Sequence, residues 1–161
     1  MRKVICFHNP DEMNGYLSNW YMSDFEWGGK KFTSMEQYMM YRKAVLFGDT
    51  AIAQEIMSTD NVGKIKALGR SVQDYDDIIW NGMRQIIVYE GLLEKFRQNY
   101  ALKSKLLATQ NHILAECAVQ DRIWGIGVSM KDERRLVMEQ WQGHNLLGFT
   151  LMQVRDTLRK E

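Results

Sequence analysis

The segment YDDIIWNGMRQIIVYEGLLEKF, residues 75–96, carries the longest amphipathic pattern in the chain and predicts its main helix. Trp80 and Arg84 lie one turn apart on one side of this helix. A different side carries the apolar residues that we expect to face a core, namely Ile79, Met83, Ile86, Leu93 and Phe96.

Shorter helical patterns precede and follow this segment. One begins at Thr33 or Ser34 and ends at Gly48, and Thr33 with Glu36 has the spacing of a capping box. The other predicted helices cover residues 50–57, 61–68, 102–108 and the stretch from 146 onward.

Strand signals are few and short. We expect strands at Val4–Phe7 and within residues 112–117, and a hairpin in FEWGGKKF, whose turn is Gly28-Gly29. The chain has a single proline and long stretches without glycine, which also favour helices. The sequence therefore predicts a mainly α-helical α+β domain with two or three short strands, spanning residues 1–161 as one unit.

Composition narrows the functional classes. With 21 basic and 20 acidic residues, the net charge of +1 argues against nucleic-acid binding by charge alone, although a local basic pocket for phosphate is compatible with it. The two cysteines and three scattered histidines lack metal-ligand spacing, so no metal site is expected. No secretion signal or membrane span is recognisable, and a cytoplasmic location with reduced thiols is the expectation.

Two pairs of residues on the predicted helices are candidates for a site. Glu36 and Lys43 share a helix face, where they could line a pocket or form a solvated surface pair. Trp80 and Arg84 could stack a flat base and hold a negative group, although a tryptophan more often fills the edge of a core.

The stretch DRIWGIG, residues 121–127, follows the predicted second strand and has the character of a site loop. Its glycines, Gly125 and Gly127, would let a ligand approach the backbone closely. Further on, residues 143–145 precede the last helix, whose N-terminus would suit a phosphate; ordinary turn chemistry with Asn145 as the N-cap is the alternative.

Several blocks in this order resemble the NADAR family, also called YbiA-like. They are FTSMEQYMMYRKA, ALGR, IWNGMRQII, EKFRQN, LLAT, LAEC with DRIWGIG, and GHNLLGFTLMQVR, and together they extend from about Leu17 to Leu158. The resemblance implies an N-glycosidase that hydrolyses the bond between ribose C1 and a nitrogen, without a metal or redox cofactor. It implies two substrate types: ADP-ribose on a guanine base, including in DNA, and the phosphoribosylated pyrimidine intermediates of riboflavin synthesis.

The resemblance also implies roles for individual residues. Its active-site glutamate, tryptophan and aspartate match Glu36, Trp80 and Asp121, and its lysine matches Lys43, whereas Gln37 stands where the family commonly has histidine. Glu36 would act as general base or stabilise the sugar cation, and Asp121 would protonate the leaving group or orient ribose hydroxyls. The other residues expected to contact substrate are Lys43, Arg70 and Arg84 at phosphates, and Trp124, Gly125 and Asn145 in the pocket wall.

Three alternatives remain at this point. Residues 128–140 look longer than in shorter YbiA-type members, and their Lys131, Arg134 and Arg135 favour the ADP-ribosyl substrate over riboflavin intermediates, unless they belong to a solvated charged helix. A non-catalytic ADP-ribose or nucleotide reader would keep the aromatic and basic residues but would not need both acids. A helical interaction protein rich in methionine, with 11 such residues, ranks last.

Overall fold

The computed structural model describes residues 2–161, and their contacts divide the chain into two units. The terminal unit consists of Met1–Tyr21 and Tyr100–Glu161, and the inserted unit consists of Met22–Asn99. Six helices and four short strands occur among the described residues, which confirms the mainly helical α+β class. The single domain expected for residues 1–161 stays a prediction, since two contact units can belong to one domain. No helix within residues 2–161 has the length and apolar character needed to cross a membrane.

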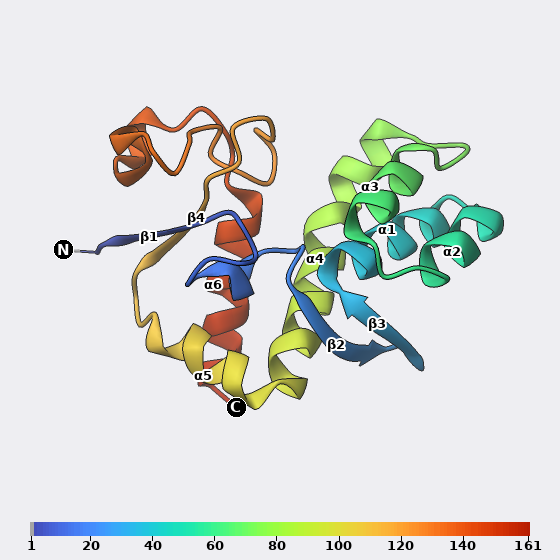
Figure 1. The fold of residues 1–161 in the computed structure, drawn as a ribbon, viewed down its shortest axis with the longest axis horizontal. Helices are drawn as coiled ribbons and strands as arrows, with labels where there is room; N and C mark the ends of the chain where they lie inside the picture. The colour runs from blue at the N-terminus through green and yellow to red at the C-terminus, as the bar shows by residue number, and fades with distance from the viewer. Residues whose placement is uncertain (1) are drawn as a thin grey trace. The chain divides into compact units, whose positions relative to one another are not determined.

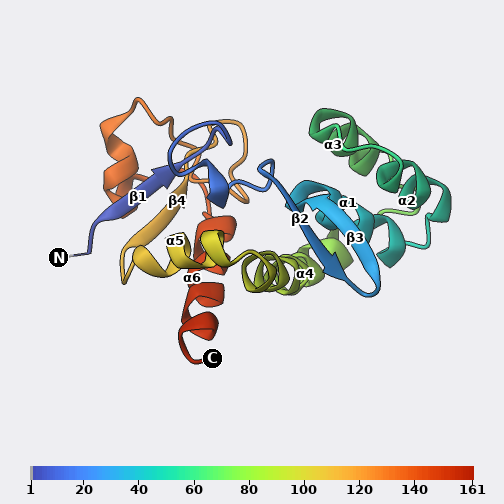
Figure 2. The same ribbon diagram turned by 60° about the horizontal axis from the view of Figure 1, so that its bottom comes forward.

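The inserted unit is built around α1 (Met35–Leu46). This helix packs against α2 (Thr50–Met57), α3 (Val62–Arg70) and α4 (Asp77–Gln98). Strands β2 (Met22–Trp27) and β3 (Lys30–Ser34) form the predicted antiparallel hairpin, and Figure 2 shows it lying beside α1. Both turn residues, Gly28 and Gly29, have positive φ, which explains why the turn uses glycine.

The N-terminus of α1 is capped differently from the sequence prediction. Ser34 accepts a hydrogen bond from the backbone N–H of Gln37, and the Gln37 side chain accepts one from the N–H of Thr33. The predicted pairing of Thr33 with Glu36 is therefore wrong. The side-chain amide of Gln37 makes the reciprocal hydrogen bond, and it also donates to the carbonyls of Ile56 and Thr59.

Helix α4 buries a different face from the one predicted. Ile79, Met83 and Ile86 are exposed, and of the predicted core residues only Phe96 is fully buried. The buried face runs along Trp80, Ile87, Val88, Gly91, Leu92, Lys95 and Phe96. Gly91 accounts for this choice, because a Cβ atom there would lie 2.2 Å from the Tyr38 ring of α1. The missing side chain lets the two helices approach on this side.

The two ends of the inserted unit are tied to each other by hydrogen bonds. The Gln98 side chain accepts from the N–H of Glu26 and donates to its carbonyl. The neighbouring Asn99 donates to the carbonyl of Asp24. The last residues of α4 are thus bound to the backbone of β2.

The terminal unit holds a two-stranded parallel sheet. Strands β1 (Val4–Phe7) and β4 (Ile113–Glu116) pair with Phe7 opposite Glu116, so both strands end at one edge. Helix α6 (Leu146–Arg159) packs on β4 and α5 (Tyr100–Ala108) packs on α6, as Figure 1 shows.

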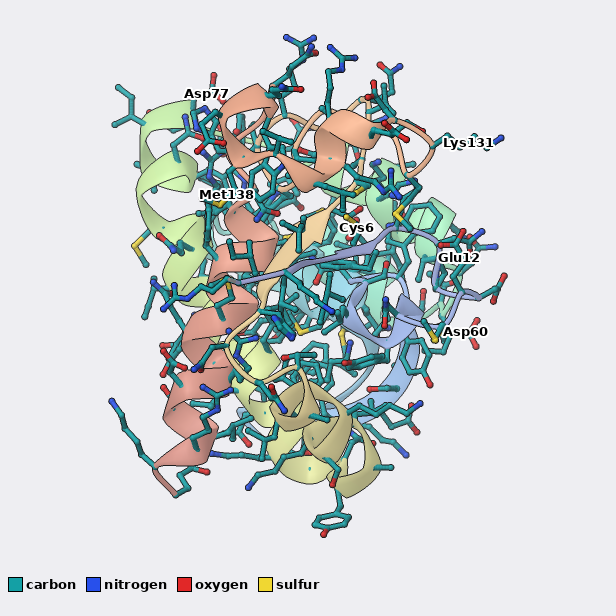
Figure 3. The ribbon with its side chains drawn as sticks, turned by 90° about the vertical axis from the view of Figure 1, so that its left-hand side faces the viewer. Cys6, Glu12, Asp60, Asp77, Lys131 and Met138 are labelled. Atoms are coloured by element: carbon teal, nitrogen blue, oxygen red, sulfur yellow. The ribbon has the colours of Figure 1, made fainter. Side chains whose placement is uncertain are left out.

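The charged segment 128–140 is not a continuous helix. It forms two short 3₁₀ turns, Glu133–Leu136 and Met138–Gln140. In Figure 3, Lys131 extends outward from this segment, in keeping with its exposure.

Candidate active-site residues

Lys43 stands at the centre of a polar cluster in the inserted unit. Its Nζ donates to the carbonyl of Gly69 at 2.8 Å. The same atom lies 4.6 Å from the centre of the Tyr75 ring and 5.7 Å from that of Trp80. The cation is thus held between a backbone carbonyl and two aromatic rings.

Burial lowers the pKa of Lys43, and nearby Arg70 adds to this effect, while the charges of Asp77 and Glu36 oppose it. Glu36, in the first turn of α1, is only 5% exposed. The structure therefore brings Glu36, Lys43 and Arg70 into one electrostatic neighbourhood, as the shared helix face predicted for the first two.

The two aromatic rings of the cluster differ in access. Trp80 is 6% exposed, so it forms the buried side of the cluster. Little of its surface is available to a ligand. Tyr75 is 42% exposed, and loss of hydration together with the hydrogen bond that its hydroxyl donates to Asp77 raises the pKa of its phenol to about 12. The sequence analysis did not select Tyr75 as a site residue. Its position just before the acidic residues that begin the helix could have indicated it.

The Nε–H group of Arg84 lacks a hydrogen-bond acceptor among the described residues. Its Nη1 donates to Asn81 at 2.8 Å, but its Nε is buried without a hydrogen-bond partner among the described residues. A buried unpaired donor on a guanidinium is costly, and an anionic ligand would satisfy it. The phosphate-binding role of Arg84 stays a prediction.

Asp121 begins the site loop of the terminal unit. Its Oδ1 accepts hydrogen bonds from the backbone N–H groups of Ile123 and Trp124, at 2.9 and 2.8 Å. This arrangement fixes the carboxyl group and commits Oδ1 as an acceptor. Oδ2 makes no hydrogen bond within residues 2–161, and it is the atom that can meet a ligand.

The N-terminus of α6 is already occupied by this loop. The N–H groups of residues 144, 145, 146 and 147 donate to the carbonyls of 122, 125, 123 and 124, respectively. These donors are the ones that a phosphate would need, so the predicted phosphate site at this helix end is wrong. The bonds instead hold the 121–125 loop rigidly on the helix.

Asn145 has a structural role in place of the predicted contact with substrate. It is fully buried, has a φ of 52°, and makes no side-chain cap bond to α6. Its side chain accepts from the N–H of Glu116 at 3.0 Å and donates to the carbonyl of Leu114 at 2.8 Å. Both the oxygen and the nitrogen of the amide therefore join the start of α6 to β4. The spacing of residues in the sequence does not predict this contact.

The two glycines of the loop serve the packing of the protein itself. A Cβ atom at Gly125 would lie 2.8 Å from both the Ala118 side chain and the Asp121 carbonyl. Gly127 has a φ of +68°. The space at Gly125 that the sequence suggested for a ligand is filled by neighbouring loop atoms.

Three polar residues of the terminal unit were missed as site candidates. His8 and Glu116 form a pair with 2.9 Å between Nδ1 and Oε1. Glu116 Oε2 and Asn19 Oδ1 are buried without a hydrogen-bond partner among the described residues. Nothing in the sequence around His8 distinguished it from the other histidines.

The structure thus gathers the predicted residues into two groups. In the inserted unit, Glu36, Arg70 and Trp80 act on the ammonium group of Lys43, and Arg84 acts on the neighbouring Tyr75. In the terminal unit, Asp121, half-buried Trp124, Gly125 and Asn145 belong to one hydrogen-bonded assembly of loop, strand and helix end.

Comparison with known proteins gives consistent matches along the whole chain. N-glycosidase R617 of Acanthamoeba polyphaga mimivirus is 37% identical over 162 residues, covering 96% of this chain and 95% of that protein. The riboflavin biosynthesis protein VVA0006 of Vibrio vulnificus is 29% identical and aligns with 99% of this chain, which spans only 40% of that longer protein.

The fold has a solved counterpart. The NMR structure of the E. coli protein YbiA matches with a TM-score of 0.82 and 25% identity, covering 99% of this chain and 88% of that one. The E. coli sequence named N-glycosidase YbiA is 27% identical, with 98% of this chain and 90% of that protein covered. The model of the NADAR domain matches residues 6–159, and the chain therefore belongs to the NADAR family.

Proposed function

We propose that the chain is an N-glycosidase that cleaves the bond between ribose C1 and nitrogen in an ADP-ribosylated base, with ADP-ribosylated guanine as the preferred substrate. Relatives across nearly the full length carry the name N-glycosidase. The observation on which the proposal depends is Glu36, a carboxylate that is only 5% exposed and whose charge acts on the half-buried Lys43.

Breaking a ribosyl C–N bond builds positive charge on the sugar ring, so the transition state resembles an oxocarbenium ion. Glu36 would stabilise this charge and accept a proton from the attacking water. Asp121 would accept hydrogen bonds from ribose hydroxyls through Oδ2, because Oδ1 is already bound by two backbone N–H groups. Of the two roles that the sequence left open for Asp121, this geometry supports orientation.

The remaining groups would bind the base and the phosphates. Tyr75 is the accessible ring of its cluster, and we assign it the base-stacking role first considered for Trp80, worth about 1–3 kcal/mol. Trp80 would form the wall behind it. Arg84, with its unsatisfied Nε, and Arg70 would bind phosphate oxygens, assisted by the charge of Lys43.

The riboflavin intermediates are the second candidate, favoured by the name of the Vibrio relative. The basic residues of segment 128–140 support the ADP-ribosyl substrate less than expected. Arg134 pairs with Asp132 at 2.6 Å, and Arg135 donates to the carbonyl of Asp132. Incubating the protein with ADP-ribosylated guanosine and, separately, with a phosphoribosylated aminopyrimidine, and measuring the released sugar, would identify the preferred substrate.

The proposal is tested by replacing each acid with its amide. We expect Glu36→Gln and Asp121→Asn each to lower kcat/KM by about 10²–10⁴-fold, because each loses a charge that acts on the reacting sugar. Exposed acids supply matched controls: Glu55→Gln on α2 and Asp156→Asn on α6 should keep wild-type activity. Thermal unfolding would verify that the variants fold. Wild-type activity in both folded active-site variants would refute the mechanism.

A further inference from the structure

The parallel sheet of the terminal unit places two titratable side chains at one edge. Phe7 and Glu116 are register partners at the ends of β1 and β4, and His8 follows Phe7 directly. The loop that carries Asp121 begins just after β4. His8, Glu116 and Asp121 thus all end or follow the two parallel strands.

His8 and Glu116 form a pair that is open to solvent on one side only. Nδ1 of His8 lies 2.9 Å from Oε1 of Glu116, and the two side chains are 53% and 11% exposed. The Glu116 backbone is fixed, because its N–H donates to Asn145 and its carbonyl accepts from Ile126. Oε2, in contrast, is buried without a partner among the described residues, an arrangement that costs stability.

The surroundings of Glu116 favour retention of a proton in this pair. Burial raises the pKa of the Glu116 carboxyl, the charge of Asp121 raises it further, and His8 opposes both. Cys117, next in the chain, also interacts electrostatically with Glu116. One proton can therefore be shared between Nδ1 and Oε1, and it can be exchanged through the exposed imidazole.

His8 is the accessible member of the pair, with 53% of its side chain exposed against 11% for Glu116. Figure 3 labels Cys6 on β1 and shows Glu12, from the loop after β1, extending away from the protein. Glu12 is exposed, and it is not among the groups that shift the pKa of Glu116. Asp121 is thus the acid that acts on the pair.

We propose that His8 and Glu116 form the proton-donating pair of the hydrolysis, with His8 delivering the proton and Glu116 positioning the imidazole. When the C1–N bond breaks, its electron pair goes to the departing nitrogen, which takes a proton from His8. Water adds its oxygen to C1 and gives its proton to Glu36. Exchange with solvent then removes this proton from Glu36 and restores the one that His8 has lost. Asp121 remains the acceptor for ribose hydroxyls. This inference rests on the proposed function. It names the general acid that protonates the leaving base, a role that the proposed function gives to no residue.

The test is the pH dependence of kcat for His8→Gln and Glu116→Gln on ADP-ribosylated guanosine and on a phosphoribosylated aminopyrimidine. A general acid must be protonated, so wild-type kcat should fall at alkaline pH. We expect kcat of His8→Gln to drop about 10²-fold and to lose this alkaline decline, with KM changed less than about threefold. Glu116→Gln should move the decline to a different pH, and Glu116→Asp should restore part of kcat.

His112→Gln is the matched control, since His112 also belongs to the terminal unit and accepts a backbone hydrogen bond from Lys3. It should retain the wild-type rate and profile. If folded His8→Gln and Glu116→Gln both keep the wild-type kcat and alkaline decline, the pair is not the acid. If the wild-type protein hydrolyses neither substrate, the proposed function itself fails, an outcome that the variants cannot mimic.

Discussion

Lys95 is a fully buried lysine on α4, and burial lowers the pKa of its ammonium group to about 7. In the unfolded chain this pKa is near its ordinary value of about 10.4. Between these two values the unfolded state binds more protons, so the free energy of unfolding rises with pH, by at most about 1.4 kcal/mol per pH unit. Below pH 7 both states are protonated, and the folded protein holds the ammonium group of Lys95 away from water.

We therefore expect Lys95→Met to raise the free energy of unfolding at pH 7 by about 2–4 kcal/mol and to remove the rise between pH 7 and 10. Methionine keeps an unbranched side chain in the same space. Urea unfolding at pH 6, 7, 8 and 9 measures both effects. The exposed Lys64→Met should leave the pH slope unchanged. A variant that is less stable at pH 7, with the wild-type slope, would contradict this explanation.

At the residue scale, side-chain chemistry was predictable and side-chain surroundings were not. Glu36 and Lys43 share one electrostatic neighbourhood because both lie on one helix, where local spacing determines the face. Asn145 was assigned to substrate from its position before a helix. Its actual partners are in β4, about thirty residues earlier, and no local rule connects these positions.

At the element scale, two glycines of α4 give opposite predictions. At Gly91 a Cβ atom would lie 2.2 Å from the Tyr38 ring, whereas at Gly82 it would meet nothing within 4 Å. Gly91→Ala should lower the free energy of unfolding by about 1–3 kcal/mol through overpacking. Gly82→Ala should raise it by about 0.5–1 kcal/mol, because alanine restricts the unfolded chain at an unstrained helical position.

Thermal or urea unfolding of the two variants measures this difference directly. Gly82→Ala is also the control for helix propensity, since both substitutions are identical and lie on the same helix. Equal effects of the two substitutions would show that the contact between α1 and α4 does not depend on Gly91.

Most helices were predictable because caps and breaks act within a few residues. Helix α2 was predicted at its observed bounds, and α4 and α6 nearly so. The buried face of α4 was not, since Ile79, Met83 and Ile86 also form a regular apolar row and only the approach of Tyr38 to Gly91 selects the other side. The capping pair of α1 was misassigned because two overlapping pairs have the same spacing, and Gln37 has further partners in and after α2.

On the scale of the whole molecule, the two acids assigned to catalysis belong to different units of the chain, Glu36 to the inserted unit and Asp121 to the terminal unit. The proposed function assigns both acids to one reaction, and residues that act as a unit have non-additive effects on kcat/KM. We expect the double variant Glu36→Gln with Asp121→Asn to lose less than the product of the two single losses. If the loss of kcat/KM in the double variant equals the product of the two single losses, the acids act independently.

The side-chain bonds of Gln98 and Asn99 to the backbone of Glu26 and Asp24 have a consequence for how the gene can be rearranged. These hydrogen bonds hold the start and the end of residues 22–99 together. We therefore expect this stretch to fold when it is excised or circularly permuted. We expect the excised fragment to show helical circular dichroism and cooperative melting, and Gln98→Ala to weaken that melting. Residues 22–99 would then be a unit that a related protein can receive whole, while its own residues 121–125 stay unchanged.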